Sequence, residues 1–208
     1  IAPFATWIKK DLINNILLPL LASPCRPLAL FSPLVPREGS LRSLTDSFRN
    51  LRPEEICALG GISLCGRSAL IWLFPLSMLA RKILPIHVTE GTANLVACFV
   101  NFFFFSSQFD ITAVDELIDN QAALTALTSG RSKDIRLIEI LMLKSSFQLA
   151  VPDTSFRSSY IQSAHNPGDL PSHGDVDSSI SILTRAGFAR DDITHSFSLK
   201  LQNTTLVL

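Results

Sequence analysis

The chain has 208 residues, of which 47% are hydrophobic and 17% charged, and its 18 basic residues balance 18 acidic ones. This length suffices for one sizeable core with an appendage, and the zero net charge excludes a strongly basic chain that binds nucleic acid through its overall charge. The four cysteines, Cys25, Cys57, Cys65 and Cys98, lack zinc-site spacing. They favour buried thiols in a reducing, intracellular compartment. Because the chain begins with Ile1 and not with Met, we expect a piece of a larger translation product.

Two terminal segments are expected to flank one main domain. Residues 7–21 place apolar residues at helical spacing and predict an amphipathic helix that ends near Pro24. Prolines at five positions between 19 and 36 then predict a connector. We therefore expect residues 1–38 to precede a domain over 39–190, and residues 191–208 to form a C-terminal tail.

The elements predicted for the main domain begin with three short strands and continue with helices and further strands. The predicted strands are 41–46, 56–64, 69–76, 109–118 and 156–162. The predicted helices are 88–105, 120–128, 133–149 and 176–186. This order predicts an α/β fold with a mixed central sheet flanked by helices.

The run LVACFVNFFFF at 95–105 raises the question of a membrane segment. It is shorter than the roughly 20 residues that span a bilayer, and Asn101 interrupts it. The apolar segment 68–86 is broken by prolines and basic residues. We expect a buried core helix with its Phe side chains against the sheet and no membrane partner, with a small membrane-associated protein as an alternative.

Four acidic residues stand at the ends of predicted elements, and each has an ordinary structural explanation. Asp119 lies between a strand and a helix, where an N-cap is typical, and Glu90 is a favourable charge in a first helical turn. Asp169 lies in a Pro/Gly turn, and Asp46 fits a solvated loop. Taken together, carboxylates at the ends of neighbouring elements are the oxygen ligands that a hard cation such as Mg²⁺ takes.

The surroundings and order of these acids resemble the ribonuclease H domain that follows reverse transcriptase in retrotransposon polyproteins. The resembling segments are VPREGS at 35–40, LTDS at 44–47, LGGISLCG at 59–66, WLFPL at 72–76, LPIHVTE at 84–90, IDNQAAL at 118–124 and SAHNPGDLPSHG at 163–174. The resemblance covers roughly residues 28–190. It implies a ribonuclease H-like mixed sheet flanked by helices, with residues 1–38 as the end of the thumb or connection region of the polymerase.

The resemblance also implies a Mg²⁺-dependent endonuclease that cleaves the RNA strand of RNA–DNA hybrids. Its catalytic and metal-binding residues would be Asp46, Glu90, Asp119 and Asp169, which would hold two Mg²⁺ ions, with Mn²⁺ as a substitute. Asp46 would bridge both ions and Asp169 would complete the second. His165 is a candidate to move a proton or loosen the product. The implied partners are an RNA–DNA hybrid and the remainder of the polyprotein, in the cytoplasm or the nucleus.

Several departures from the family pattern bear on activity. Asp115 and Glu116 occupy a predicted central strand, where buried strands are nearly continuously apolar. His173 stands where the family usually has Arg, Gly168 where it has Ala, and the segment after Asp46 is longer than a simple hairpin needs. Two alternatives therefore stay open: a decayed enzyme that keeps the fold, and a non-catalytic connection module that positions a template–primer duplex.

Overall fold

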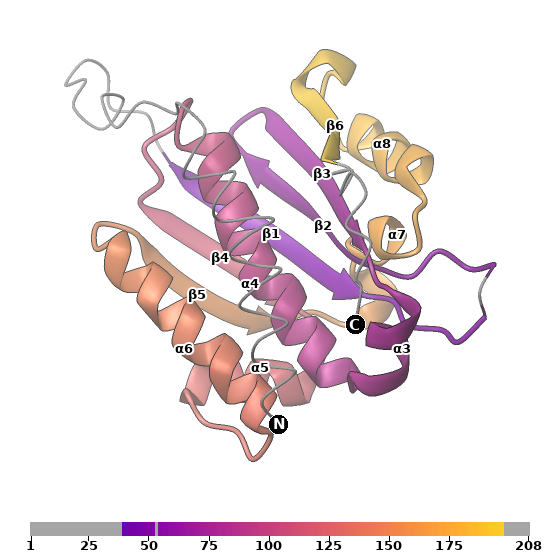
Figure 1. The fold of residues 1–208 in the computed structure, drawn as a ribbon. Helices are drawn as coiled ribbons and strands as arrows, with labels where there is room; N and C mark the ends of the chain where they lie inside the picture. The colour runs from indigo at the N-terminus through magenta and orange to yellow at the C-terminus, as the bar shows by residue number, and fades with distance from the viewer. Residues whose placement is uncertain (1–38, 53, 198–208) are drawn as a thin grey trace, which may run out of the picture. The chain divides into compact units, whose positions relative to one another are not determined.

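The computed structural model describes residues 39–52 and 54–197, which form a six-stranded sheet with flanking helices (Figure 1). The strands are β1 (Ser40–Ser47), β2 (Ala58–Cys65), β3 (Ser68–Pro75), β4 (Ala113–Ile118), β5 (Ser155–Tyr160) and β6 (Ile193–Phe197). The helices are α3 (Met78–Ile83), α4 (Ile86–Phe105), α5 (Gln121–Ser129), α6 (Ile135–Ala150), α7 (Asp169–Ser172) and α8 (Val176–Arg185). Two 3₁₀ turns are η3 (Ser163–His165) and η4 (Arg190–Asp192). The predicted helix over 7–21, the connector and Cys25 lie outside the described residues.

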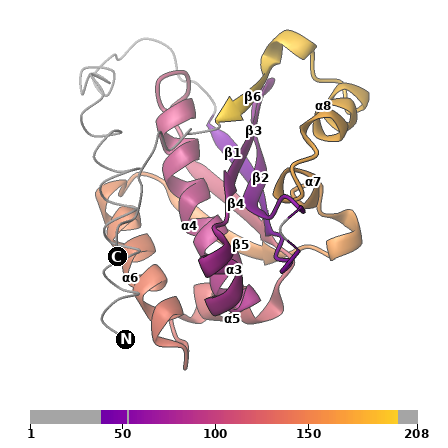
Figure 2. The same cartoon turned by 45° about the vertical axis from the view of Figure 1, so that its right-hand side comes forward.

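The sheet is mixed, with the strand order β5-β4-β1-β2-β3-β6. The pairs β1–β2 and β2–β3 are antiparallel, whereas β4 pairs in parallel with both β1 and β5, and β6 with β3. Figure 2 shows α4 and α6 on one face of the sheet and α7 and α8 on the other. The predicted α/β class, a mixed central sheet flanked by helices, is confirmed.

Four elements differ from the sequence prediction. The strand expected from residue 109 begins only at Ala113, while α3, α7 and β6 had no counterpart in the predicted elements. The β6 strand pairs with β3, and its first residue, Ile193, is opposite Ala69. Such a pairing joins residues far apart in the chain, so local sequence pattern carries little sign of it. Three cysteines, at positions 57, 65 and 98, are buried and free, as predicted, and burial raises the pKa of Cys65 to about 11.

Helix α4 is the central core helix, and its packing explains its apolar composition. It lies against β1 and β2 and also packs on α6. Among the described residues, α4 is the one helix that is long enough and apolar enough to cross a membrane. However, 72% of its apolar stretch is buried within the protein. The Phe side chains, expected against the sheet, do not pack against the sheet alone. Phe105 is fully buried, but Phe99 and Phe102 lie edge-on to Phe147 of α6, with ring centroids 4.9 and 5.7 Å apart.

The two acids of the central strand β4 point to opposite faces, because side chains alternate along a strand. Glu116 is buried and accepts a 2.6 Å hydrogen bond from Nζ of Lys144 on α6, whose side chain is only 6% exposed. Lys144 also donates to Asn94 of α4 at 2.6 Å. Asp115 instead pairs with the exposed Arg157 of β5 at 2.7 Å. Glu116 is therefore neutralised inside the core, and the apparent departure from an apolar strand does not disturb the fold.

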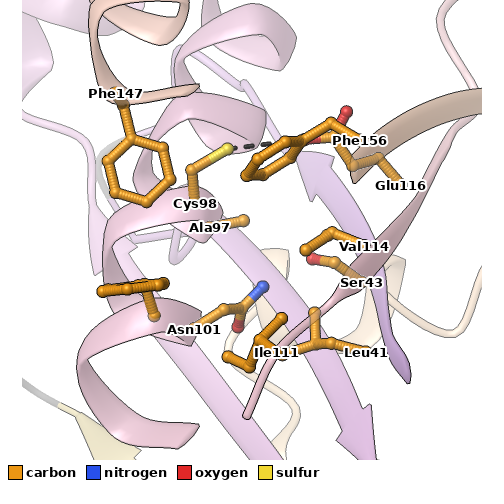
Figure 3. Close-up of a pocket in the computed structure, with 11 residues that line it drawn as sticks. Leu41, Ser43, Ala97, Cys98, Asn101, Ile111, Val114, Glu116, Phe147 and Phe156 are labelled. Carbon is orange, nitrogen blue, oxygen red and sulfur yellow. Dashed lines mark hydrogen bonds between the residues drawn. The ribbon is translucent and has the colours of Figure 1, made fainter. Parts of the chain in front are cut away.

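A small pocket adjoins this network between α4 and the sheet (Figure 3). It is lined mainly by apolar side chains, with Cys98 donating to Oε1 of Glu116 at 3.4 Å. The Asn101 amide and the Ser43 hydroxyl also line it, and neither has a hydrogen-bond partner among the described residues. Its free space of about 10 Å³ is close to what one water molecule needs to bond such groups.

We expect Lys144→Met to lower the free energy of unfolding by about 3–5 kcal/mol, because Glu116 would remain buried without its partner. The double variant Glu116→Leu with Lys144→Met should lose less, since it removes both charges together. Urea denaturation followed by circular dichroism measures both. Arg157→Met is the matched control and should change stability by at most about 1 kcal/mol, as its pair with Asp115 is exposed. If Lys144→Met were as stable as the double variant, Lys144 would not be the partner that balances the buried charge of Glu116.

Candidate metal centre

Strands β1 and β4 bring two of the predicted acids to one edge of the sheet. They are parallel neighbours in which Thr45 is opposite Ile118, so the next residues, Asp46 and Asp119, emerge side by side. Glu90 reaches the same edge from α4, which precedes β4 in the chain. The three side chains offer carboxylate oxygens that all lie within 4.8 Å of one another. Asp46 and Glu90 are 6% and 2% exposed, so this three-acid group is largely shielded from water.

Hydroxyl groups fix the directions of the two buried acids. Oε1 of Glu90 accepts from the backbone N–H and from the hydroxyl of Ser47, each at 3.1 Å. The Ser47 hydroxyl also lies 2.7 Å from that of Thr89, which joins the end of β1 to α4. Oδ2 of Asp46 accepts from the buried hydroxyl of Ser172 at 2.6 Å. No hydroxyl or amide of the described residues donates to Oε2 of Glu90.

Burial and mutual repulsion make the charged form of these acids costly. Burial is the main cause that raises the pKa of Glu90 well above its ordinary value; the Asp46 charge, a hydrogen bond to Asp46 and the Asp119 charge add to it. Burial also raises the pKa of Asp46, against hydrogen bonds from Ser172 and Glu90 that lower it. In the described part of the chain no Lys, Arg or His forms an ion pair with the three acids. A bound cation would lower the cost of the charged form of Asp46 and Glu90.

The fourth predicted acid, Asp169, lies at the rim of this group. It is the first residue of α7, is exposed, and does not belong to the set of oxygens within 4.8 Å. It is still close enough for its charge to raise the pKa of Asp46. Its carboxylate pairs with Nε2 of His173 at 3.3 Å, and the His173 ring stacks on Phe48 with centroids 3.5 Å apart. By contrast, His165 is exposed in η3, so the histidine that contacts a predicted site residue is His173.

Three of the ordinary explanations for these acids are wrong. Asp46, expected in a solvated loop, is buried within β1. The N-cap of α5 is Asn120, whose side chain accepts from the Ala123 N–H at 3.0 Å, so the Asp119 carboxylate is not used as a cap. Glu90 lies beyond the first turn of α4 and is buried, so it does not act as an exposed charge at the helix N-terminus. The carboxylates of Asp119 and Glu90 therefore do not stabilise a helix N-terminus, and both are available to bind a ligand.

Sequence reasoning missed Ser172 and the packing that carries it. A Cβ on Gly60 would lie 2.4 Å from the Ser172 backbone nitrogen, and one on Gly168 would lie 2.8 Å from the Leu44 carbonyl oxygen. Helix α7 therefore approaches β1 and β2 backbone to backbone. Asn166 adds a 3.0 Å hydrogen bond from its amide to the Thr45 carbonyl. The available signal was Gly60 inside a predicted strand, since glycine there marks the close approach of another backbone.

The donor set suits a hard divalent cation. All three groups offer oxygen, and cations such as Mg²⁺, Mn²⁺ and Ca²⁺ prefer carboxylate oxygen. Oε2 of Glu90 is buried without a hydroxyl or amide donor. A cation would also relieve the repulsion that raises the pKa of Asp46 and Glu90. Asp46, Glu90 and Asp119 can therefore hold a metal ion.

No protein-family model and no curated protein sequence matches the chain. Solved structures are similar to it, among them the following three. RNase H1 from the halophilic archaeon Halobacterium salinarum NRC-1 aligns with 67% of this chain and 99% of its own, at 14% identity and a TM-score of 0.49. The N-terminal RNase H domain of Rv2228c from Mycobacterium tuberculosis, solved fused to maltose-binding protein, aligns with 69% and 98%, at 9% identity and 0.48. The protease–reverse transcriptase of prototype foamy virus aligns with 74% of this chain and 21% of its own, at 14% identity and 0.40.

Without added divalent cations, the protein should lose stability as the pH rises above about 4.5, the ordinary pKa of Glu. Below that pH, Glu90 is protonated in both folded and unfolded chains. Above it the unfolded chain ionises freely, whereas the folded chain, with its raised pKa, resists until the pH passes the folded-state value. Glu90→Gln cannot ionise, so its melting temperature should exceed that of wild type at pH 7 and match it near pH 4.

Thermal melts from pH 4 to 8 in EDTA test this expectation, and the difference between variant and wild type isolates Glu90 from other titrating groups. The exposed Glu54→Gln is the matched control and should follow wild type throughout. Adding Mg²⁺ at pH 7 should raise the melting temperature of wild type more than that of Glu90→Gln. A Glu90→Gln variant less stable than wild type at pH 7 in EDTA would contradict the raised pKa.

Proposed function

We propose that the chain is a divalent-cation-dependent phosphodiester hydrolase of the ribonuclease H type, which cleaves the RNA strand of RNA–DNA hybrids as part of a retroelement reverse transcriptase. The three-acid group at the ends of β1 and β4 carries this proposal. The hybrid substrate and the polyprotein context rest on the resemblance of segments 35–47, 59–76, 84–90, 118–124 and 163–174 to that family. The exposed position of Asp169, at the rim, is compatible with a substrate that approaches from that side.

The residues of the site suit hydrolysis of a phosphodiester. Two Mg²⁺ ions, when bound, would activate water and stabilise the charge on the leaving oxygen. Asp46, Glu90 and Asp119 would hold them, with Asp169 completing the second position. The backbone of β1 and β4 fixes where Asp46 and Asp119 point, while Ser47 holds Glu90. Pre-set carboxylates of this kind need no reorganisation when the cation and substrate arrive.

Substrate selection would depend on the shape of the nucleic-acid duplex and not on its base sequence. In an RNA–DNA hybrid the 2′-hydroxyls of one strand line a wide, shallow minor groove, and proteins recognise them without reading bases. We therefore propose cleavage of the RNA strand with little sequence preference. The membrane-associated alternative receives no support from α4, because most of its apolar stretch packs inside the described domain.

With Mg²⁺ the full chain should cleave the RNA strand of a labelled RNA–DNA hybrid, and Asp119→Asn should reduce cleavage to the level of a blank. The substitution removes a charge that a cation needs but leaves the α5 cap intact, because Asn120 supplies that cap. Asp191→Asn, the same change at an exposed acid, is the matched control and should cleave as wild type does. Ca²⁺, which takes more ligands at longer distances, should bind without supporting turnover.

Each other result has a defined meaning. Equal cleavage by wild type and Asp119→Asn would show a contaminating host nuclease. No cleavage by a folded wild type that binds Mg²⁺ would overturn the enzyme and favour a decayed domain or a connection module that positions a template–primer duplex.

A further inference from the structure

Ser172 contacts two of the predicted site acids, Asp46 of β1 and Asp169 of α7. It is the last residue of α7, and none of its surface is exposed. Its hydroxyl lies 2.6 Å from Oδ2 of Asp46 and 2.8 Å from the backbone carbonyl oxygen of Asp169. A serine hydroxyl has a single proton, so it can donate to only one of these oxygens at a time.

We propose that Ser172 is a positioning residue that links Asp46 to the helix carrying Asp169, so that both acids face the same cation. The inference deepens the proposed function and rests on it. Its hydrogen bond to Asp46 is a side-chain contact through which α7 reaches the three-acid group. A change at Ser172 therefore acts on the metal centre through Asp46 and through the place of α7.

The remaining contacts of α7 hold the helix near the site but do not orient Asp46. Gly60 permits the close approach of the Ser172 backbone, and Asn166 bonds the Thr45 carbonyl. His173, the next residue, contacts Asp169 and stacks on Phe48. Two consecutive residues thus contact one acid each: Ser172 contacts Asp46 from inside the protein, and His173 contacts Asp169 at the surface.

The hydrogen bond from Ser172 can persist when a cation binds. Each oxygen of a carboxylate has two lone pairs, so Oδ2 of Asp46 can accept from the Ser172 hydroxyl and bind a cation at the same time. The Asp169 carbonyl oxygen, at 2.8 Å, is a second acceptor within reach of the same hydroxyl. Ser172 can therefore hold the direction of Asp46 without neutralising its charge, whereas an ion pair with Lys or Arg would neutralise it.

Ser172→Ala should weaken divalent-cation binding by about 10- to 100-fold, the usual effect of removing a group that orients a metal ligand. Titration of the full chain with Mn²⁺, followed by electron paramagnetic resonance and by calorimetry, measures affinity and the number of ions bound without any turnover. The matched control is Ser179→Ala in α8. Ser179 is equally buried, and its hydroxyl donates to the Asp175 carbonyl at 2.8 Å, away from the three-acid group. It should bind Mn²⁺ as wild type does.

Ser172→Cys supplies a second variant of nearly the same size with a weak donor, should Ser172→Ala fold poorly. Weakened Mn²⁺ binding by a folded Ser172 variant, with normal binding by Ser179→Ala, supports the inference. Wild-type affinity in a folded Ser172 variant, an equal loss in Ser179→Ala, or no Mn²⁺ binding by wild type overturns it. If wild type binds Mn²⁺ but cleaves no hybrid, the proposed function fails, while the comparison of affinities still decides the role of Ser172.

Discussion

The parallel pairing of β1 with β4 is the constraint on which the rest of the domain depends. Two parallel neighbours cannot be joined by a tight turn, so the chain must cross the sheet between them. Here α4 forms the last part of that crossing, from β3 to β4, and it is largely buried because it packs on the sheet and beside α6. The apolar run that resembles a membrane segment is a consequence of this position. The same crossing brings Glu90 over the ends of the two strands, where Asp46 and Asp119 leave the sheet.

The domain contains two kinds of buried carboxylate, and their partners distinguish them. Glu116 has Lys144 at 2.6 Å, a closed ion pair that needs nothing from outside the core. Asp46 and Glu90 have hydroxyl and backbone donors but no basic partner among the described residues. Serine donors orient an acid without cancelling its charge. The charge of Glu116 is therefore balanced within the core by Lys144, whereas the charge of Asp46 and Glu90 has no basic partner among the described residues and would be balanced by a cation.

The sequence was most informative where one residue pattern determines one element. The apolar run over 95–105 predicted α4 as a buried core helix, and the order of the four acids at the ends of predicted elements predicted the meeting of Asp46, Glu90 and Asp119. It was least informative where contacts between two distant segments determine the position of a side chain. Whether Asp119 or its neighbour Asn120 caps α5 depends on which side chain the strand end directs inward. Phe99 and Phe102 face Phe147 because α6 packs beside α4, which the sequence of α4 alone does not show.

The contact of α7 with the sheet has a consequence for how accurately the domain can be assembled. Where Gly60 meets Ser172 and Gly168 meets Leu44, no side chain separates the two backbones. Side chains can change rotamer and accommodate error, whereas main-chain atoms in contact cannot. The separation between the backbone of Asp169 and the strands that carry the other acids is therefore set by contacts between main-chain atoms. One methyl group added at either glycine would lie within 3.0 Å of main-chain atoms, so α7 would have to move outwards with the fourth acid, whereas a functional site tolerates only about 0.5 Å.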